Sequence, residues 1–480
     1  MSRRPTGWSE FSIRYLGGTV GGKTPSKADS RFWSPSEIHW ASPKDMKSVV
    51  LVTTEDRISR FATTNAGMTV LPEGSVLMVT RSGILSHTFP VLITRIPTAI
   101  NQDIKAVLPS SFLDGRYLAY NLRSKEREIL RSCTKEGTTV ASVETNLLEN
   151  LPLPLAPLNE QKRIADKLDA VLARVDACRE RLDRIPAILK RFRQSVLAAA
   201  TSGKLTEEWR TVRRLKEWPS STVGESSSLV TKGASPKWQG ISYVDDPSQT
   251  LFVTSENVGQ GQMLLNEKKY VENEFNKKQA RSMLKRGDVL TNIVGASIGR
   301  AAIYDRDVLA NINQAVCVIR VDDSKLSNKF LMYFLNSPQG VANIIGGAVE
   351  VARANVSLGT ISNLAFKLPT LDEQTEIVRR VEDLFAYANR LEARYTASRA
   401  LVETLTPALL AKAFRGELVP QDPNDEPASV LLERIRASRA DTQAKPKQRR
   451  SADRGKPVEL ELLPMVAEPQ SVYRRQKRRG

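Results

Sequence analysis

The sequence is poor in the residues that build disulfide frameworks and metal sites. It holds three cysteines and two histidines among 480 residues. Cys133, Cys178 and Cys317 stand far apart, which argues against a disulfide framework and favours a reducing cytoplasm. His39 and His87 do not cluster with them, so we expect no zinc finger and no histidine-based metal site.

Long apolar runs and catalytic signatures are missing as well. No run of about 18 apolar residues exists, and residues 1–12 carry charge without an apolar segment, so neither a membrane span nor a signal peptide is expected. There is no Asn/Asp-Pro-Pro-Tyr/Phe run, no Gly-x-Gly-x-x-Gly after a strand and no hydrolase motif around either histidine. We therefore expect no catalytic residues in this chain.

Positive charge is abundant. Lys and Arg number 71 against 53 Asp and Glu, a net charge of +18, which favours a polyanionic partner, nucleic acid first and an anionic membrane second. Residues 441–480 hold eleven basic and five acidic residues and few apolar ones, so the chain is not expected to fold beyond about residue 440. The length alone suggests about three domains.

The chain contains an internal repeat with an offset of 213 residues. The sequence LNEQ at 158–161 matches LDEQ at 371–374. Other matches at offsets of 211–213 are Gly203 with Gly416, Leu71–Leu77 with Leu284–Leu290, Asn101–Gln102 with Asn313–Gln314, and the Gly-x-Thr/Ser-Pro turns Gly22–Pro25 and Gly233–Pro236. The sequences between these matches differ strongly. The duplication therefore preserves the matched positions and little else.

Apolar residues at alternating steps of four and three predict a long helix in each half. The pattern starts at Ile164 and recurs in the same phase from Ile377, with one polar lapse at Ser398. We favour two long helices packed on each other; the alternative is two amphipathic helices on a globular core. The residues expected in the core between the helices are Ile164, Leu168, Val171, Val175, Leu182, Ile185, Leu189, Ile377, Val381, Leu384, Leu391, Val402 and Leu405.

Each helix should be about 35–40 residues long, roughly 55–60 Å at 1.5 Å per residue. Asn159 and Asp372 can cap the starts, and the glycines of the repeat are natural stops. Pro186 and Pro407 lie inside the periodic stretches, so each should kink its helix or split it in two.

The segments before the helices indicate mixed α/β domains. Short apolar runs predict strands at 49–52, 76–79, 289–294 and 315–319, and residues 330–336 predict a short helix. The expected division is two α/β domains at 1–155 and 211–366, two helices at 156–210 and 367–420, and a C-terminal extension at 421–480.

The segment Gly17–Thr24 fits the phosphate-binding pattern GxxxxGK[ST], which makes a P-loop NTPase the alternative function. Three observations count against it. The motif should open a helix, but Pro25 and a polar stretch follow. Residues 11–16 make a poor buried strand before it, and the second half keeps only the turn at Gly233–Pro236.

These features resemble the specificity subunit of type I restriction-modification enzymes. The resemblance covers about residues 10–435 and is carried by Leu158–Val196, Gly203–Thr206, Leu371–Gln374, Ala411–Leu418, Gly22–Pro25, Ile38–Trp40 and Ile312–Gln314. It implies a mixed α/β fold in which two target-recognition domains are separated by two long helices that form an antiparallel coiled coil, with approximate two-fold symmetry.

The resemblance also implies partners. Each recognition domain would read one half of a bipartite, asymmetric target in double-stranded DNA, and the helices would set the spacer and dock two methylation subunits. Those subunits use S-adenosylmethionine, and the restriction subunits of the full complex use ATP and magnesium; this chain itself would bind no cofactor. A coiled-coil scaffold without a role in DNA binding is the other interpretation left open.

Candidate DNA-facing residues are polar or basic side chains in loops of the two α/β domains, where they could reach base edges or phosphates. Trp33, Trp40 and Trp238 are expected in the core rather than against bases, and Asn101 and Asn313 are expected to be buried structural amides. The candidates are Lys23, Thr24, Ser26, Lys27, Arg81, Ser82 and Gln102 in the first domain, and Lys232, Ser235, Lys237, Asn292, Arg300, Gln314 and Arg353 in the second.

Overall fold

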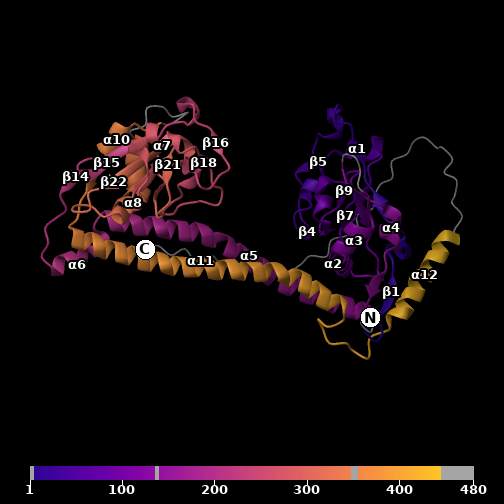
Figure 1. Ribbon diagram of the computed structural model, residues 1–480. Coiled ribbons are helices and arrows are strands. Elements are labelled where there is room, and N and C mark those ends of the chain that lie inside the picture. Colours follow the sequence, from indigo (N-terminus) through magenta and orange to yellow (C-terminus); the bar gives the residue numbers. More distant parts are fainter. Residues whose placement is uncertain (1–4, 136–139, 347–354, 445–480) are drawn as a thin grey trace. The chain divides into compact units, whose positions relative to one another are not determined.

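The computed structural model describes residues 5–135, 140–346 and 355–444 (Figure 1). The chain forms two compact units: residues 168–409 make one, and the other combines residues 1–167 with residues 410–480. Each unit holds strands and helices, so the mixed α/β fold predicted from the sequence is confirmed.

The first unit contains two sheets of four and five strands. The five-stranded sheet has the order β2-β10-β7-β8-β4 and the four-stranded sheet the order β5-β3-β9-β6. Helix α2 packs on strands β7 and β8. The bounds are β2 Val20–Gly21, β3 Ile38–Ala41, β4 Val50–Leu51, β5 Asp56–Ile58, β6 Val70–Leu71, β7 Val76–Val79, β8 Val91–Thr94, β9 Thr98–Ile100, β10 Ile104–Val107 and α2 Gly115–Ser124.

The second unit repeats this plan with two four-stranded sheets. One has the order β15-β22-β19-β20 and the other the order β16-β18-β17-β21. Helix α8 packs on β19 and β20, as α2 packs in the first unit. The bounds are β15 Ser227–Lys232, β16 Tyr243–Val244, β17 Thr250–Val253, β18 Tyr270–Val271, β19 Val289–Asn292, β20 Ala301–Ile303, β21 Ala310–Ile312, β22 Val316–Val321 and α8 Asn328–Asn336.

Smaller elements complete each unit. The pair β1 and β13 joins the ends of the first domain, and β14 with β23 does the same in the second. The bounds are β1 Ser9–Phe11, β11 Thr134–Lys135, β12 Ser142–Val143, β13 Leu153–Leu155, β14 Ser220–Thr222, β23 Ala365–Lys367, α1 Arg60–Asn65, α3 Glu126–Ser132, α4 Thr145–Asn150, α6 Glu207–Val212, α7 Glu274–Lys278, α9 Pro338–Gly346 and α10 Leu358–Ser362.

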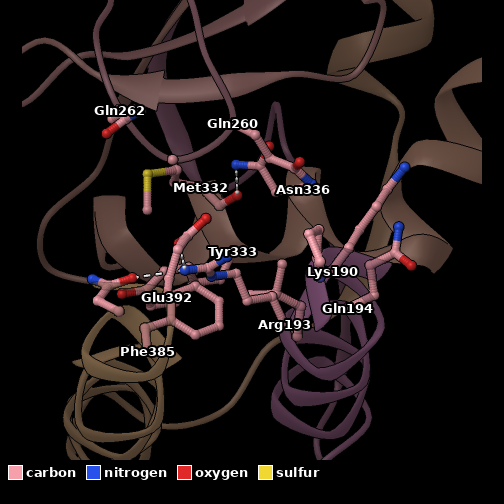
Figure 2. Close-up of a pocket in the computed structure, with 14 residues that line it drawn as sticks. Lys190, Arg193, Gln194, Gln260, Gln262, Met332, Tyr333, Asn336, Phe385 and Glu392 are labelled. Atoms are coloured by element: carbon pink, nitrogen blue, oxygen red, sulfur yellow. Dashed lines mark hydrogen bonds and ion pairs between the residues drawn. The ribbon is translucent and has the colours of Figure 1, made fainter. Parts of the chain in front are cut away.

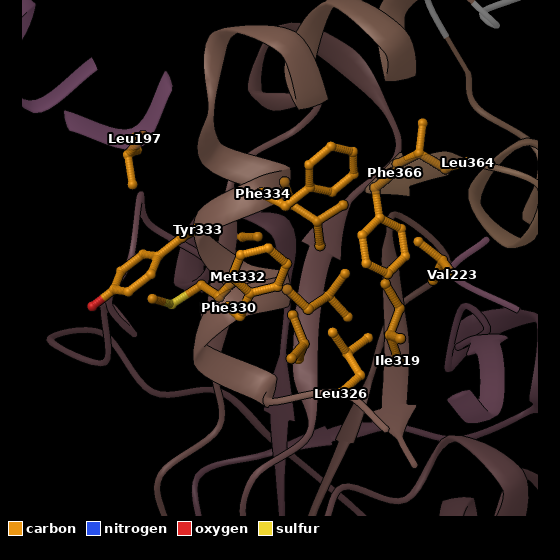
Figure 3. Packing of buried hydrophobic residues seen from close by; sticks show 14 of the residues in the cluster. Leu197, Val223, Ile319, Leu326, Phe330, Met332, Tyr333, Phe334, Leu364 and Phe366 are labelled. Atoms are coloured by element: carbon orange, nitrogen blue, oxygen red, sulfur yellow. The ribbon is translucent and has the colours of Figure 1, made fainter. Parts of the chain in front are cut away.

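The core of the second unit is built around helix α8. Phe330 and Phe334 pack against Phe366 of β23, and Leu326, Ile319 and Val223 extend the same apolar cluster (Figure 3). Residues of both long helices, among them Leu197 and Ile377, belong to this cluster, so the helices are part of the domain core.

The two predicted long helices are present. Helix α5 runs from Leu158 to Thr201 and α11 from Leu371 to Phe414, 44 residues each. Of the two outcomes expected at Pro186 and Pro407, the split is wrong, because both helices continue through their prolines, and the kink stays a prediction. A proline removes one backbone hydrogen bond, and packing of the flanking turns outweighs that loss.

The helices pair antiparallel inside the second unit. Arg193 of α5 donates to Asn389 and Glu392 of α11 at 2.8 and 2.6 Å. Towards the other end, Arg179 donates to the Thr406 hydroxyl at 3.0 Å. Because residue numbers rise along one helix while those of their partners fall along the other, the two helices run in opposite directions.

Burial along the helices is uneven. Among the residues expected between them, Ile164, Leu168, Val175, Leu189, Ile377 and Val381 are buried, while Val171, Leu182, Ile185, Leu384, Leu391, Val402 and Leu405 are half-buried. Two helices cover only one face of each other, so full burial occurs mainly where an α/β domain adds a third surface.

The repeated Glu-Gln pair ties each long helix to its domain. Gln161 is fully buried and accepts from the backbone N–H of Asp114, the N-cap of α2, at 3.0 Å. Gln374 accepts likewise from the N–H of Ser327, the N-cap of α8, at 2.7 Å. The repeat therefore preserves this joint between helix and domain.

Residues beyond α11 complete the first unit. Asp425 forms an ion pair with Arg163 at 2.5 Å, and the N–H of Ala428 donates to the carbonyl of Gly7 at 2.8 Å. Helix α12, Ala428–Ala444, packs against β1. The sequence did not predict this helix, and its last turn passes residue 440, where the chain was expected to stop folding. The rest of the basic tail lies outside the described residues.

Candidate nucleic-acid interface

The first domain joins two motifs that the repeat had marked separately. The turn at Gly22–Pro25 follows β2 and lies against Ile100, the last residue of β9, and Asn101, the next residue. A Cβ atom on Gly22 would stand 2.0 Å from the carbonyl oxygen of Ile100, so only glycine fits. The N–H of Lys23 donates to that same carbonyl at 3.0 Å.

The second domain repeats the arrangement. A Cβ on Gly233 would lie 1.8 Å from the carbonyl oxygen of Ile312 and 2.8 Å from that of Asn313. The N–H of Asn313 donates to Val253, and that of Asn101 to Ala41, so both loops start from the same end of a parallel strand pair. The motifs shared by the two halves thus lie together in each domain. We call this arrangement the two-loop site: Gly22–Pro25 with Asn101–Gln102 in the first domain, and Gly233–Pro236 with Asn313–Gln314 in the second.

Two tryptophans fix the first of these sites. The indole of Trp40 donates to the carbonyl of Lys23, and that of Trp33 donates to the carbonyl of Ser26, each at 3.1 Å. Their rings pack edge to face with centroids 5.3 Å apart. Trp40 is buried and Trp33 half-buried, so the backbone between them is held while the Lys23 side chain projects into solvent.

The asparagines shape the tips of the second loops. Asn101 is buried and accepts from the N–H of Asp103, and Asn313 is half-buried and accepts from that of Ala315, each at 3.1 Å. These tight turns leave the next residue, Gln102 or Gln314, exposed at the tip. An exposed amide carries both donors and acceptors, the groups that read base edges.

The remaining first-domain candidates lie nearby in the chain or in space. Lys23, Thr24, Ser26 and Lys27 are exposed on one turn, and the Thr24 hydroxyl donates to Gln102. The N–H of Arg81 donates to the carbonyl of Asp103 at 3.2 Å, which brings its exposed side chain to the same loop. Ser82 is half-buried and caps a short helical turn.

The candidate residues of the second domain differ in how exposed their side chains are. Lys232, Lys237, Arg300 and Gln314 are exposed and Ser235 is half-buried. Asn292 is fully buried, and its amide donates to the carbonyl of Ser255 at 2.9 Å. Its side chain therefore holds a loop and is not offered to a ligand, so we withdraw it as a DNA-facing residue. Arg353 lies outside the described residues.

Uncompensated positive charge marks these turns. In the part of the chain that the structure describes, the side chains of Lys23, Lys27, Lys232 and Lys237 form no ion pair. Cations that are not already neutralised by carboxylates can neutralise phosphates and release counterions. The site can therefore grip a polyanion as well as present amide and hydroxyl groups.

Sequence reasoning misplaced one aromatic residue. Trp238 was expected in the core, yet its side chain is 79% exposed, directly after the Gly233–Pro236 turn. Residue type alone does not predict whether this tryptophan is buried or exposed. The only available signal was its place within a polar, basic turn.

The phosphate-binding interpretation of Gly17–Thr24 gains no support. Val20–Gly21 forms a strand, and no helix opens at Thr24. The N–H of Lys23, which should face a phosphate, is bonded to a backbone carbonyl instead.

A separate cavity of about 580 Å³ lies where helices α5 and α11 meet the second domain (Figure 2). Its lining mixes apolar Met332, Tyr333 and Phe385 with the ion pair between Arg193 and Glu392. Burial raises the pKa of Tyr333 to about 12, so this phenol stays protonated at neutral pH. The cavity thus offers packing surface and a paired charge.

The described residues carry neither a metal-ion cluster nor a membrane-spanning helix. Among those that the structure describes, no cluster of three or more His, Cys, Asp or Glu side chains could hold a metal ion. None of the described helices is both long and apolar enough to cross a bilayer.

The family model for the type I restriction modification DNA specificity domain matches residues 5–187 and 246–398. The chain therefore belongs to the family of type I restriction-modification specificity subunits. It is similar to the specificity subunit of the Escherichia coli type I restriction enzyme EcoBI, with 36% identity over 63% of this chain and 68% of the relative. The specificity subunit of the Salmonella potsdam enzyme StySPI is 32% identical over 72% of this chain and 76% of the relative.

Solved structures show the same fold. A chain from a structure that describes complex assembly and conformational transition of a type I restriction-modification system aligns over 86% of this chain and 99% of its own length, with a TM-score of 0.61 and 17% identity. The HsdS subunit of Thermoanaerobacter tengcongensis aligns over 86% of this chain and 98% of its own length, with a TM-score of 0.54 and 18% identity.

Proposed function

We propose that this specificity subunit reads a bipartite, asymmetric target in double-stranded DNA, one half with each α/β domain. The observation that carries this proposal is the two-loop site, which recurs in both domains. The first places Lys23 and Gln102 at its surface, and the second Lys232 and Gln314. Because other turn residues differ between the domains, with Ala234 and Trp238 in the places of Lys23 and Lys27, the two half-sites should differ in sequence.

The helices would set the length of the unread spacer and dock two methylation subunits, with restriction subunits joining in the full complex. Exposed apolar side chains on the helices, Ile188, Tyr387 and Leu401, give such partners apolar area to bury. The chain acts in the cytoplasm, beside the DNA that it reads. It binds no cofactor and has no active site; S-adenosylmethionine, ATP and magnesium are used by the partner subunits.

Methylome sequencing of cells that express the chain with its cognate methylation subunit tests this function. The expected result is a methylated motif of two different short halves separated by a fixed run of unread bases. Methylation that is absent, or that follows one continuous motif, would contradict the proposal. The purified chain alone should show no methyltransferase, nuclease or ATPase activity, and turnover abolished by a point mutation in it would contradict the assignment of catalysis to partners.

Exchanging residues of about 1–155 for those of another family member tests the division of labour between the domains. One half of the methylated motif should change and the other should persist, because base contacts act over hydrogen-bond distances. A simultaneous change in both halves would show that the domains do not read independently.

A further inference from the structure

Trp238 stands where the recognition turn of the second domain faces solvent. It lies on a 3-10 turn, Lys237–Gln239, that directly follows Gly233–Pro236. Among the described aromatic side chains it is the most exposed, at 79%. Leaving an indole ring in water forfeits a large favourable burial energy, so a ring in this position needs an explanation.

The turn beneath the ring is well fixed. The N–H of Ile241 donates to the carbonyl of Pro236 at 3.0 Å, and the ammonium of Lys278 donates to the carbonyl of Gln239 at 2.8 Å. Gly240 closes the turn with a φ of +68°, and Gly233 seats it against Ile312. The indole is therefore held out by an ordered backbone, and little ordering is left to oppose binding.

The charge around Trp238 indicates which partner covers it. Residues 226–244 contain no Asp or Glu, while Lys232 and Lys237 are exposed. The cores of protein interfaces are depleted of lysine. An aromatic ring between lysines without carboxylate partners suits a groove of double-stranded DNA, where cations neutralise phosphates and an apolar side chain can contact base edges such as the thymine methyl group.

Resting on the proposed function, we infer that Trp238 is a specificity-determining residue of the second domain. Its indole contacts a base edge in the groove of the half-site that this domain reads, while Lys232 and Lys237 hold neighbouring phosphates. The corresponding position of the first domain, five residues after Gly22, is Lys27. The aromatic contact therefore belongs to one half-site only.

The test uses the full chain with its methylation subunit and compares Trp238→Ala, Trp238→Phe and Val212→Ala. Val212 is also 79% exposed but lies in α6, outside the recognition loops. Trp238→Ala should bind a duplex carrying the methylated motif about tenfold more weakly. Its methylome should lose discrimination at one or more positions of a single half-site. Trp238→Phe should keep most of the affinity and the same motif, and Val212→Ala should match the parent.

Two outcomes would overturn the inference. One is Trp238→Ala with the affinity and methylated motif of the parent. The other is Trp238→Ala that no longer associates with the methylation subunit, since the ring would then serve a protein interface. Thermal denaturation of each variant checks that folding is unchanged. A parent complex without any bipartite motif would instead refute the proposed function, which separates the two failures.

Discussion

The indole nitrogen of Trp8 donates a hydrogen bond to the buried carboxylate of Glu160 across 3.0 Å. Trp218 makes the same bond to Glu373 across 2.9 Å in the second unit. Both glutamates are 1% exposed and open the long helices at matching places in the repeat. The same joint is thus built twice, but its remaining contacts differ.

The second oxygen distinguishes the two joints. In Glu373, Oε1 accepts from the Thr206 hydroxyl at 2.8 Å and from the Arg210 guanidinium at 3.1 Å. In Glu160, Oε1 has no hydrogen-bond partner within the described part of the chain. Burial raises the pKa of Glu160, although the bond from Trp8 and the charge of Arg163 oppose the shift.

Glu160→Gln should leave the first unit as stable as the parent or more stable at about pH 7–8. The folded pKa lies above the ordinary value of 4.5, so the folded chain binds this proton more tightly than the unfolded chain. The resulting stability is fully present below pH 4.5 and is lost as the pH rises through the folded pKa. Thermal denaturation across this range should show the advantage of Glu160→Gln shrinking towards acid pH. A variant clearly less stable than the parent at neutral pH would contradict this account.

Glu373→Gln should behave in the opposite way and destabilise the second unit. It removes the negative charge that Arg210 contacts, and that arginine is itself largely buried. Breaking one side of such a pair costs about 3–5 kcal/mol when both groups are fully buried, and less where solvent reaches one of them. Denaturant unfolding of the two glutamine variants side by side measures the contrast.

Ile377→Asp should destabilise the second unit by about 3 kcal/mol or more, because Ile377 is fully buried in the core shared by helix and domain. Leu401→Asp on the same helix is the matched control, since Leu401 is 63% exposed. It should change the free energy of unfolding by less than about 0.5 kcal/mol. Equal losses in the two variants would show that burial does not decide the effect.

Inserting one heptad in each long helix should lengthen the unread spacer. The hydrogen bond between Arg179 and Thr406 identifies neighbouring insertion points. Seven residues add roughly 10 Å of helix, close to the length of about three base pairs. Methylome sequencing should find both half-sites unchanged around a longer spacer. Altered bases within a half-site would instead place the helices in the recognition surface.

Two truncations separate the roles of the C-terminal segments. Deleting residues after 444 should leave the recognised motif unchanged and weaken only salt-sensitive attraction, because Lys and Arg can neutralise phosphates without reading bases. Deleting residues after 420 also removes α12, whose Leu431, Leu432 and Ile435 are buried, and should lower the melting temperature of the first unit. Equal melting temperatures for both truncations would show that α12 does not stabilise that unit.

Long periodic features were predictable from the sequence, since each carries its own evidence. The heptad spacing predicted α5 and α11, and the apolar runs predicted β7 at Val76–Val79 and β22 near 315–319. The heptad spacing could not predict how deeply each of its apolar residues is buried. Leu182 fits the pattern as well as Leu168, but only Leu168 is fully buried in the structure.

The candidate site was predictable only in pieces. The repeat singled out Gly22 and Asn101, yet nothing local indicates that one packs on the other, because that contact depends on the pairing of β2 with β10. Trp238 was expected to be buried and is exposed, whereas Asn292 was expected to be exposed and is buried. The reason is the same in both cases. Whether a side chain faces the core or the solvent is set by neighbours distant in sequence.

The joining of residues 1–167 with residues from 410 onward has a consequence for how the protein is made. A ribosome delivers the first α/β domain early, but Asp425 and α12, which complete that unit, emerge only after the whole second domain. Domains generally fold in the order of synthesis. Here we expect the reverse order: the second unit has all its residues first, while β1 keeps an open side until α12 has been synthesised.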